Sequence, residues 1–363
     1  MDTGTRLELI KGVGEEIITE KELRELLRKK RHPIAYDGFE PSGTDIHIAQ
    51  GLLRAINVNK MTKAGCRFKM LVADWHAWAN NKMGGDLEKI QNVGKYLIEV
   101  WKACGMDLSN VEFVWASDLV KEDDYWKTVL EISRKSTVKR IIRCGQIMGR
   151  KEDEVLQASQ ILYPCLQFTD IFTLKADITQ LGMDQRKVNM LAREIGPSMG
   201  LWKPVVVSHH MLMGLGKPAS SESDTLERTI DLKMSKSRPD TAVFMSDSPV
   251  ELTRKIDKAY CPEGQVRENP VLEYCRYIIF EKLREMGKPF NIERSQKYGG
   301  PLSFETYDEL EKAFCEKGLH PMDLKKAVSE HLNLLLEPVQ KSLKRNNKAQ
   351  ALAREIRTYR VTR

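Results

Sequence analysis

The sequence predicts an α/β fold, in which a doubly wound parallel sheet occupies the first two thirds of the chain and a helical region follows. Two observations support this prediction. Up to about residue 210, short apolar runs bounded by turn residues alternate with segments of helical periodicity, and beyond Pro249 only helical periodicity remains. Strands that alternate with helices are joined by right-handed crossovers, which place the strands parallel and the helices on both faces.

Five apolar runs are expected to form the strands. Each is short, rich in apolar and β-branched or aromatic residues, and bounded by turn residues, as buried parallel strands are. The first begins at Ile34, and the others cover 68–73, 111–116, 176–181 and 205–208. In such a Rossmann-like sheet, ligands bind beyond the carboxyl ends of the strands, where the turns collect.

Helical periodicity predicts the remaining elements. The first helix, 19–30, opens with a capping box formed by Thr19 and Glu22. The other helices are expected at 49–64, 86–104, 123–150, 185–195, 250–260, 270–286, 303–317 and 322–346. We therefore expect a Rossmann-like catalytic domain, 1–247, followed by an all-α domain, 248–363.

Composition sets the class of protein. With 363 residues, of which 41% are apolar and 30% charged, the chain should fold and has room for two cores. It contains no run of eighteen apolar residues, and its first ten residues are too charged for a secretory signal. The seven cysteines are widely spaced, unlike the ligands of a zinc knuckle. We expect a cytoplasmic protein without a membrane span or a structural metal.

The C-terminal end of the chain is strongly basic. Between Lys341 and Arg363 there are eight Lys or Arg residues and one acid, Glu355, an excess as large as the +7 of the whole chain. A basic end on an otherwise balanced chain suggests contact with a polyanion such as RNA. A solvated helical tail is the alternative, and charge alone leaves both open.

A predicted phosphate site lies in the segment 34–50, which reads as a strand, a turn rich in Gly, Pro and Ser, and the start of a helix. His47 and Gln50 are three residues apart, so both are expected on one face of the first helical turn. The unpaired N–H groups of a helix start favour an anion. The side chains of His47 and Gln50 add two hydrogen-bond donors beside these N–H groups, and together they predict a phosphate-binding site.

Two stretches resemble the HIGH and KMSKS signatures of class I aminoacyl-tRNA synthetases. KMSKS at 233–237 matches letter for letter, whereas HIAQ at 47–50 has Ala and Gln in place of Gly and the second His. Further motifs follow in the order of the archaeal and eukaryotic tyrosyl-tRNA synthetases: YDGFEPSG, LVADWHAW, YPCLQFTDI, GMDQRKVNMLARE, KMSKS, AYCPEG and LHPMDLKKAV. The chain thus resembles that family over nearly its whole length.

A second constellation is Tyr163, Gln167 and Asp170, which fall at positions i, i+4 and i+7 and so share one helical face. Pro164 lacks an N–H, so the helix is expected to be kinked or to begin there. Each of these residues alone would most simply be a satisfied polar group. The resemblance is what raises them to candidate site residues.

The resemblance implies a pocket for tyrosine. Tyr36 and Asp170 would bind the phenolic hydroxyl, Tyr163, Gln167 and Gln185 would hold the α-ammonium group, and Leu71 and Ala73 would line the ring. Phenylalanine would leave the two hydroxyl-binding groups unpaired, which is costly in a buried pocket. The pocket is therefore expected to select tyrosine.

The resemblance also implies a two-step reaction with ATP as substrate. The tyrosine carboxylate would attack the α-phosphate, giving tyrosyl-adenylate and pyrophosphate, and tyrosine would then pass to the 3′ end of tRNA(Tyr). Catalysis would rest on positioning and on stabilising charge at the phosphates. His47, Gln50, Lys233 and Lys236 are the catalytic and ATP-binding candidates, with Gly38 also at the ATP site and Mg²⁺ bridging pyrophosphate oxygens.

Two places are expected to contact tRNA. The resemblance assigns Arg143, Arg186 and Lys187 to the first base pair of the acceptor stem, and Tyr298, His320 and Asp323 to the first anticodon base. Stacking and edge recognition suit an unpaired base. The alternatives are that Asp323 caps a helix and that Arg143 lies on a solvated helical face. The resemblance further implies a homodimer.

Three other interpretations remain open. A tryptophanyl-tRNA synthetase shares the fold and both signatures but has no use for a Tyr36 and Asp170 pair aimed at a hydroxyl. A non-catalytic paralogue that binds tRNA would not need an intact KMSKS. A small-molecule nucleotidyltransferase would need neither the helical domain nor the basic tail.

Overall fold

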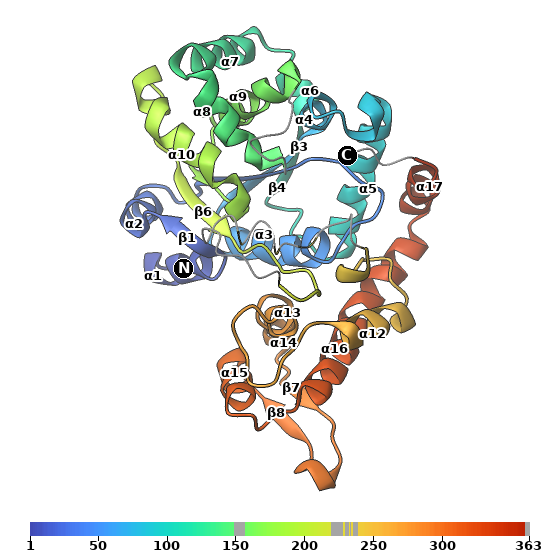
Figure 1. Ribbon diagram of the computed structural model, residues 1–363. Coiled ribbons are helices and arrows are strands. Elements are labelled where there is room, and N and C mark those ends of the chain that lie inside the picture. Colours follow the sequence, from blue (N-terminus) through green and yellow to red (C-terminus); the bar gives the residue numbers. More distant parts are fainter. Residues whose placement is uncertain (149–156, 219–227, 229–231, 233, 235–238, 360–363) are drawn as a thin grey trace.

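The computed structural model describes residues 1–148, 157–218, 228, 232, 234 and 239–359. A six-stranded sheet with the order β1-β6-β5-β2-β3-β4 forms the centre of the first region (Figure 1). Its strands are β1 (Gly14–Ile18), β2 (Ile34–Phe39), β3 (Arg67–Val72), β4 (Val111–Trp115), β5 (Ile178–Thr179) and β6 (Val205–His209). Strands β2 to β6 pair in parallel, and β1 joins the edge beside β6 in antiparallel orientation.

All five predicted strands are present and parallel, although β5 is shorter than predicted. Strand β1 was not predicted, because its sequence GEEII has only two apolar residues and lies at the sheet edge. From β2 the order runs to β3 and β4 on one side and to β5 and β6 on the other. The strand order therefore reverses between β2 and β5, which is the place where a doubly wound sheet binds ligands.

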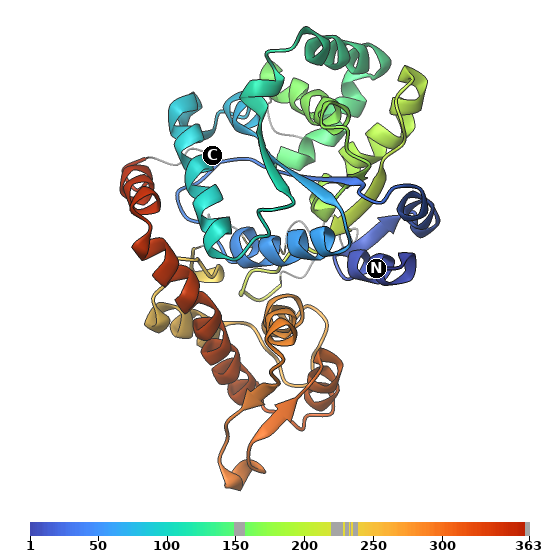
Figure 2. The ribbon, with the colours of Figure 1, turned by 180° about the vertical axis from the view of Figure 1, so that it is seen from behind.

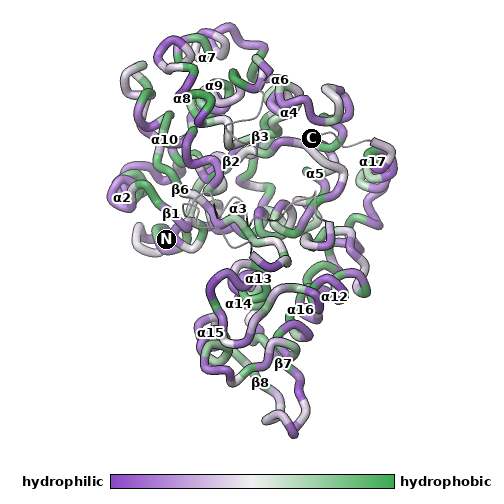
Figure 3. The backbone as a smooth tube through the Cα atoms, viewed as in Figure 1, coloured by the Kyte–Doolittle hydropathy of each residue, from purple (hydrophilic) through white to green (hydrophobic). Residues whose placement is uncertain are grey.

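Helices cover both faces of this sheet. They are α1 (Thr3–Lys11), α2 (Glu20–Lys29), α3 (Arg54–Lys63), α4 (Asp74–Ala79), α5 (Leu87–Ala103), α6 (Ala116–Leu119), α7 (Asp123–Lys135), α8 (Val138–Cys144), α9 (Ala158–Thr173) and α10 (Arg186–Ile195). Buried side chains of α3 and α5 share one core, and those of α7, α8, α9 and α10 share another. Apolar and polar residues alternate along these helices, as expected of helices with one buried face (Figure 3).

Several predicted helices differ in their bounds. The predicted helix 123–150 is interrupted after α7, where Thr137 starts α8 by accepting a hydrogen bond from the Arg140 backbone N–H, 3.3 Å. Helix α9 begins at Ala158 and continues through Pro164, so the helix does not begin at the proline. The capping box of Thr19 and Glu22 at the start of α2 is present as predicted.

The C-terminal region lies below the sheet in the view of Figure 1. Its helices are α12 (Pro249–Lys258), α13 (Pro270–Tyr274), α14 (Phe280–Met286), α15 (Tyr307–Cys315), α16 (Pro321–Arg345) and α17 (Asn347–Ile356). The region is helical as predicted, with one addition that the prediction lacked. An antiparallel ribbon of β7 (Phe290–Ile292) and β8 (Leu302–Phe304) carries a loop that points away from the rest of the molecule.

The basic C-terminal end folds back onto the first region. Helix α17 lies beside α5 in both views of the ribbon (Figures 1 and 2). The side-chain amide of Asn92 donates to Glu355 Oε1, 2.7 Å, and Asn346 donates to Glu99 Oε2, 2.9 Å. One core extends from the sheet into α12, α13 and α16. The division into domains 1–247 and 248–363 stays a prediction, and Ser248 caps α12 at that boundary.

No helix in the part of the chain that the structure describes has the length and apolar character needed to cross a bilayer.

Candidate active site

The buried end of the candidate cleft is built on β2 and α9. Tyr36 of β2 and Asp170 of α9 are 1% and 0% exposed. The Tyr36 side chain belongs to the same core as Leu71, Ala73 and Tyr163. On β2, Gly38 faces the same side as Tyr36, and a Cβ at Gly38 would lie 3.2 Å from the Tyr36 hydroxyl. Glycine therefore keeps space open beside that hydroxyl.

The Asp170 carboxylate has two partners that sequence analysis missed. The Tyr125 hydroxyl donates to Asp170 Oδ1, 2.8 Å. His76 Nε2 lies 2.8 Å from Asp170 Oδ2, an ion-pair distance without the alignment of a hydrogen bond. His76 is on α4 and Tyr125 on α7, so three helices converge on one carboxylate. His76 stands in the quoted motif LVADWHAW and could have been found there, whereas no sequence spacing marks Tyr125.

Burial and the nearby Asp170 carboxylate shift the pKa values of Tyr36 and His76. Burial and the charges of Asp170 and Asp37 raise the pKa of Tyr36 well above its usual value. Burial would lower the pKa of His76, but the Asp170 charge outweighs this and raises it. Tyr36 is therefore a neutral hydroxyl at ordinary pH, able to donate a hydrogen bond. A protonated His76 would balance the carboxylate.

The three residues predicted to hold an ammonium group also lie near this end. Gln167 Nε2 donates to Gln185 Oε1, 3.0 Å. The Tyr163 ring packs edge-on against the His76 ring, with 5.1 Å between centroids. Tyr163 and Gln167 are buried on α9, and Gln185 is half-buried in the turn before α10. The structure thus brings together all seven residues predicted to bind tyrosine.

At the other end, the structure adds a π-turn to the predicted helix start that carries His47 and Gln50. His47 precedes the helix and pairs with Phe244 in an isolated bridge, while the helix begins at Ala49 with a π-turn that leads into α3. The Leu53 N–H donates to the Ile48 carbonyl five residues back, 3.2 Å. The His47 carbonyl accepts from the Gln50 and Gly51 N–H groups, 2.9 and 3.0 Å, so His47 stands at the start of the helix and Gln50 in its first turn, as expected. Such π-turns are frequent at functional sites.

Backbone contacts also hold His47 and Gln50 together. The Gln50 N–H donates to His47 Nδ1, 3.3 Å, and the Gln50 carbonyl accepts from the Trp101 indole, 2.7 Å. Trp101 stacks on Phe113 and packs edge-on against Phe39, which fixes its ring. The position of Gln50 is thus set by a buried aromatic group on α5.

The segment that follows the KMSKS stretch returns beside His47. Lys233 and Lys236 lie outside the described residues. Downstream of them, the Val243 carbonyl accepts from the Ile48 N–H, and the Met245 N–H donates to the Ile46 carbonyl, both at 2.8 Å. We call residues 242–247 the return segment. Backbone hydrogen bonds therefore connect the return segment to the two residues that flank His47.

Comparison with known proteins decides the family. The family of class I tRNA synthetases for tryptophan and tyrosine (W and Y) matches residues 28–337. The chain belongs to this family. The synthetase is 50% identical to the cytoplasmic tyrosine–tRNA ligase 1 of Arabidopsis thaliana over 99% of its own length and 89% of that protein.

Two solved structures are also similar to the synthetase. The tyrosyl-tRNA synthetase of Pyrococcus horikoshii, complexed with L-tyrosine, is 39% identical with a TM-score of 0.89, over 98% of this chain and 100% of that one. The Leishmania major enzyme, in complex with tyrosinol, is 44% identical with a TM-score of 0.89. The synthetase covers 99% of its own length in that match but spans only 61% of the Leishmania chain.

The three residues predicted to contact an acceptor stem share one surface. Arg143, Arg186 and Lys187 of the synthetase line a depression of about 410 Å³ between α8 and α10. Arg143 is exposed, in line with either a solvated face or an RNA contact. Arg186 is held by Glu16 of β1, with Nε 2.8 Å from Oε2.

The predicted anticodon residues lie at the far end of the synthetase from the sheet. Tyr298 is 63% exposed in the loop between β7 and β8, with the Lys297 ammonium 5.6 Å from its ring centroid. His320 caps α16 by accepting from the Met322 N–H, 3.2 Å, and Asp323 follows in the first turn. His320 rather than Asp323 is therefore the capping residue.

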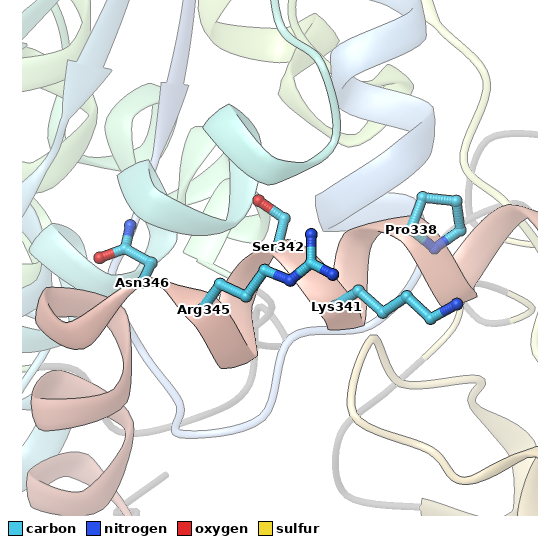
Figure 4. A pocket seen from close by; sticks show the side chains of 5 residues that line it. All are labelled: Pro338, Lys341, Ser342, Arg345 and Asn346. Carbon is cyan, nitrogen blue, oxygen red and sulfur yellow. The ribbon is translucent and has the colours of Figure 1, made fainter.

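Part of the predicted basic tail of the synthetase lies on the surface of α16. Lys341 and Arg345 line an open depression of about 480 Å³ near the end of this helix (Figure 4). Lys341 pairs with Glu337, 2.6 Å, and Lys348 pairs with Glu99 of α5, 3.2 Å. Lys348 therefore joins α17 to α5, whereas Lys344, Arg345, Arg354 and Arg357 are exposed. Arg360 and Arg363 lie outside the described residues.

Proposed function

We propose that this chain is a tyrosine–tRNA ligase, which activates L-tyrosine with ATP and transfers it to tRNA(Tyr). The observation that supports this most directly is the buried Asp170 carboxylate beside Tyr36, in a family whose members act on tryptophan or tyrosine. Full-length similarity to tyrosine–tRNA ligases of plants and archaea adds to it.

In this proposal the buried end of the cleft recognises the substrate hydroxyl. Asp170 would accept a hydrogen bond from the substrate hydroxyl. The neutral Tyr36 hydroxyl would donate a hydrogen bond to the oxygen of that same substrate hydroxyl. His76 and Tyr125 hold Asp170 in place, so the carboxylate is oriented before the substrate arrives. Tryptophan and phenylalanine lack this hydroxyl, and each would leave buried polar groups unpaired, at a cost of about 1–3 kcal/mol per group.

The amide groups of Gln167 and Gln185, with Tyr163, would bind the substrate ammonium and aim its carboxylate at ATP. A carboxylate needs no activation by a protein nucleophile, so its placement in line with the α-phosphate is the main requirement. His47 and Gln50 would contact the phosphates, together with Gly38, Lys233 and Lys236. Hydrogen-bond donors that are already in position stabilise the charge that develops there.

Mg²⁺ would enter with ATP and neutralise charge on the departing pyrophosphate. Among the described residues, no group of three or more His, Cys, Asp or Glu side chains is arranged to hold a metal ion. Mg²⁺ at nucleotide sites is usually held by one or two carboxylates together with the substrate phosphates.

The tRNA contacts follow from the two surfaces described above. Arg143, Arg186 and Lys187 would receive the acceptor stem, and Tyr298, His320 and Asp323 would receive the first anticodon base. We further propose that the enzyme acts in the cytoplasm as a homodimer, as implied by its resemblance to this family.

Exchange of pyrophosphate into ATP, measured without tRNA, tests the proposal. Tyrosine should support exchange, and tryptophan should not. Exchange with tryptophan alone would identify a tryptophanyl enzyme, and no exchange with either would indicate a non-catalytic paralogue. Charging of tRNA(Tyr) with labelled tyrosine then separates a ligase from a small-molecule nucleotidyltransferase.

A further inference from the structure

The return segment, residues 242–247, is held from two sides. On one side its backbone bonds to residues 46–48, which fixes Phe244 opposite His47. On the other side it faces helices α12 and α16 of the C-terminal region. The contacts on this second side belong to no residue that the proposed reaction uses.

Lys255 of α12 is the first contact. Its ammonium group donates to the Ala242 carbonyl, 2.9 Å, and to both Asp247 carboxylate oxygens, 2.8 and 2.9 Å. Asp247 Oδ2 also accepts from the Phe244 N–H, 2.8 Å. The Lys255 side chain is only 4% exposed. A buried lysine that joins both ends of a short segment restricts it strongly, because breaking a buried pair leaves an uncompensated charge.

Gln340 of α16 is the second contact. Its side-chain amide nitrogen donates to the Met245 carbonyl, 3.0 Å, and to the Asp247 carbonyl, 2.9 Å. Both hydrogens of one NH₂ group are thus used on two carbonyls of the return segment. Gln340 therefore fixes the backbone immediately next to Phe244, the residue that faces His47.

We propose that Gln340 and Lys255 are positioning residues for the adenylate-forming step. They hold the return segment in register with His47, so that the chain leaving the KMSKS stretch stays aligned with the phosphate end of the cleft. Neither residue touches substrate in this proposal. The inference rests on the proposed function, because it assumes that His47 contacts the phosphates of ATP.

The inference makes a specific kinetic prediction. A shift of about 1 Å in a group that positions substrate can cost about a hundredfold in rate. Loss of the contacts from Gln340 or Lys255 to the return segment should therefore impair use of ATP. The tyrosine pocket is built on other elements and should stay intact. A general loss of structure would instead weaken tyrosine binding and the use of ATP together.

Gln340→Glu is the sharpest variant, because it keeps the size of the side chain and removes both donors. We expect kcat/KM for ATP in tyrosine-dependent pyrophosphate exchange to fall by about tenfold or more. The equilibrium Kd for tyrosine, measured by calorimetry, should stay within about twofold. Gln340→Met, which is neutral, should show the same split and so exclude an effect of the new charge.

Glu337→Gln is the matched control, since Glu337 is exposed on the same helix, one turn before Gln340, and pairs with Lys341 on the surface of α16. It should behave as the native enzyme. If the Gln340 variants exchange like the native enzyme, or lose tyrosine binding as much as ATP use, the inference is overturned. Failure of the proposed function would look different, because the native enzyme itself would then show no tyrosine-dependent exchange.

Discussion

The two ends of the cleft are built in different ways. At the tyrosine end, Asp170 lies within a buried core and is held by side chains from α4 and α7. At the proposed phosphate end, His47 is half-buried at the start of a helix and is held by a segment from almost two hundred residues later in the chain. In the proposed function, recognition of tyrosine would therefore be built into the buried core, whereas alignment of the phosphates would depend on segments that are distant in sequence.

The largest effect is expected from Asp170→Ala, which removes the acceptor at the tyrosine end. Tyrosine and phenylalanine should then support exchange about equally, because no buried carboxylate is left for the hydroxyl to satisfy. The ratio of kcat/KM for the two amino acids measures this. Undiminished selectivity would mean that the hydroxyl is recognised elsewhere.

Tyr125→Phe should have the next largest effect. It leaves Asp170 in place but removes one hydrogen bond to a charged group, worth about 1.5–3 kcal/mol. We expect weaker selection of tyrosine and a lower free energy of unfolding, with KM for ATP unchanged. Urea unfolding and exchange kinetics measure the two effects separately. A change confined to ATP would contradict the separation of the two ends.

Gln50→Ala should have a smaller effect, at the phosphate end only. It removes an uncharged donor, worth about 0.5–1.5 kcal/mol, while the bond from Trp101 to the Gln50 carbonyl survives. Adenylate formation, measured in single turnovers, should slow by up to about tenfold, with tyrosine affinity unchanged. An unchanged rate would remove Gln50 from the site.

The last prediction concerns stability and leaves both ends of the site unchanged; it involves His210, where the first region meets the C-terminal region. Burial would lower its pKa, but contacts with Glu15 and Glu273 outweigh this and raise the pKa to about 9. Its ring also stacks on Tyr277. The charged form is therefore favoured in the folded state, and its stabilisation is complete below about pH 6.5 and lost as the pH rises through 9.

Stability should accordingly fall by about 1 kcal/mol per pH unit between pH 7 and 9. In His210→Gln this slope should flatten, as shown by urea unfolding at pH 7, 8 and 9. An equal slope in the variant would assign the pH dependence to another group. His210 contacts Glu15, Glu273 and Tyr277, none of which belongs to the proposed tyrosine pocket, so affinity for tyrosine should be unchanged in the variant.

Local sequence patterns predicted much of this molecule. The apolar runs of β2, β3, β4 and β6 and the i, i+4, i+7 spacing of Tyr163, Gln167 and Asp170 are local properties, and each appears in the structure. Strand β1 escaped prediction because it is an edge strand of polar residues. The ribbon of β7 and β8 has strands of only three residues, too short for a periodic signal.

What could not be predicted depends on contacts between distant segments. No spacing connects Tyr125 with Asp170, 45 residues apart, or Gln340 with Met245, 95 residues apart. The bridge between His47 and Phe244, just before the π-turn of Ala49–Leu53, is likewise a contact between distant segments. The roles assigned to the site residues stay predictions until the variants above are measured.

Helix α16 has a consequence for how this chain can change in length. The helix starts at Pro321, beside the predicted anticodon residues, and reaches the return segment at Gln340. Each inserted residue would rotate one end against the other by about 100°, so a single insertion would aim the Gln340 amide into solvent. An insertion of about seven residues, close to two full turns, would restore the direction of the Gln340 side chain but lengthen helix α16 by about 10 Å. Small insertions here are therefore expected to break the contacts of Gln340, and an insertion of about seven residues would instead displace the end that carries His320 by about 10 Å.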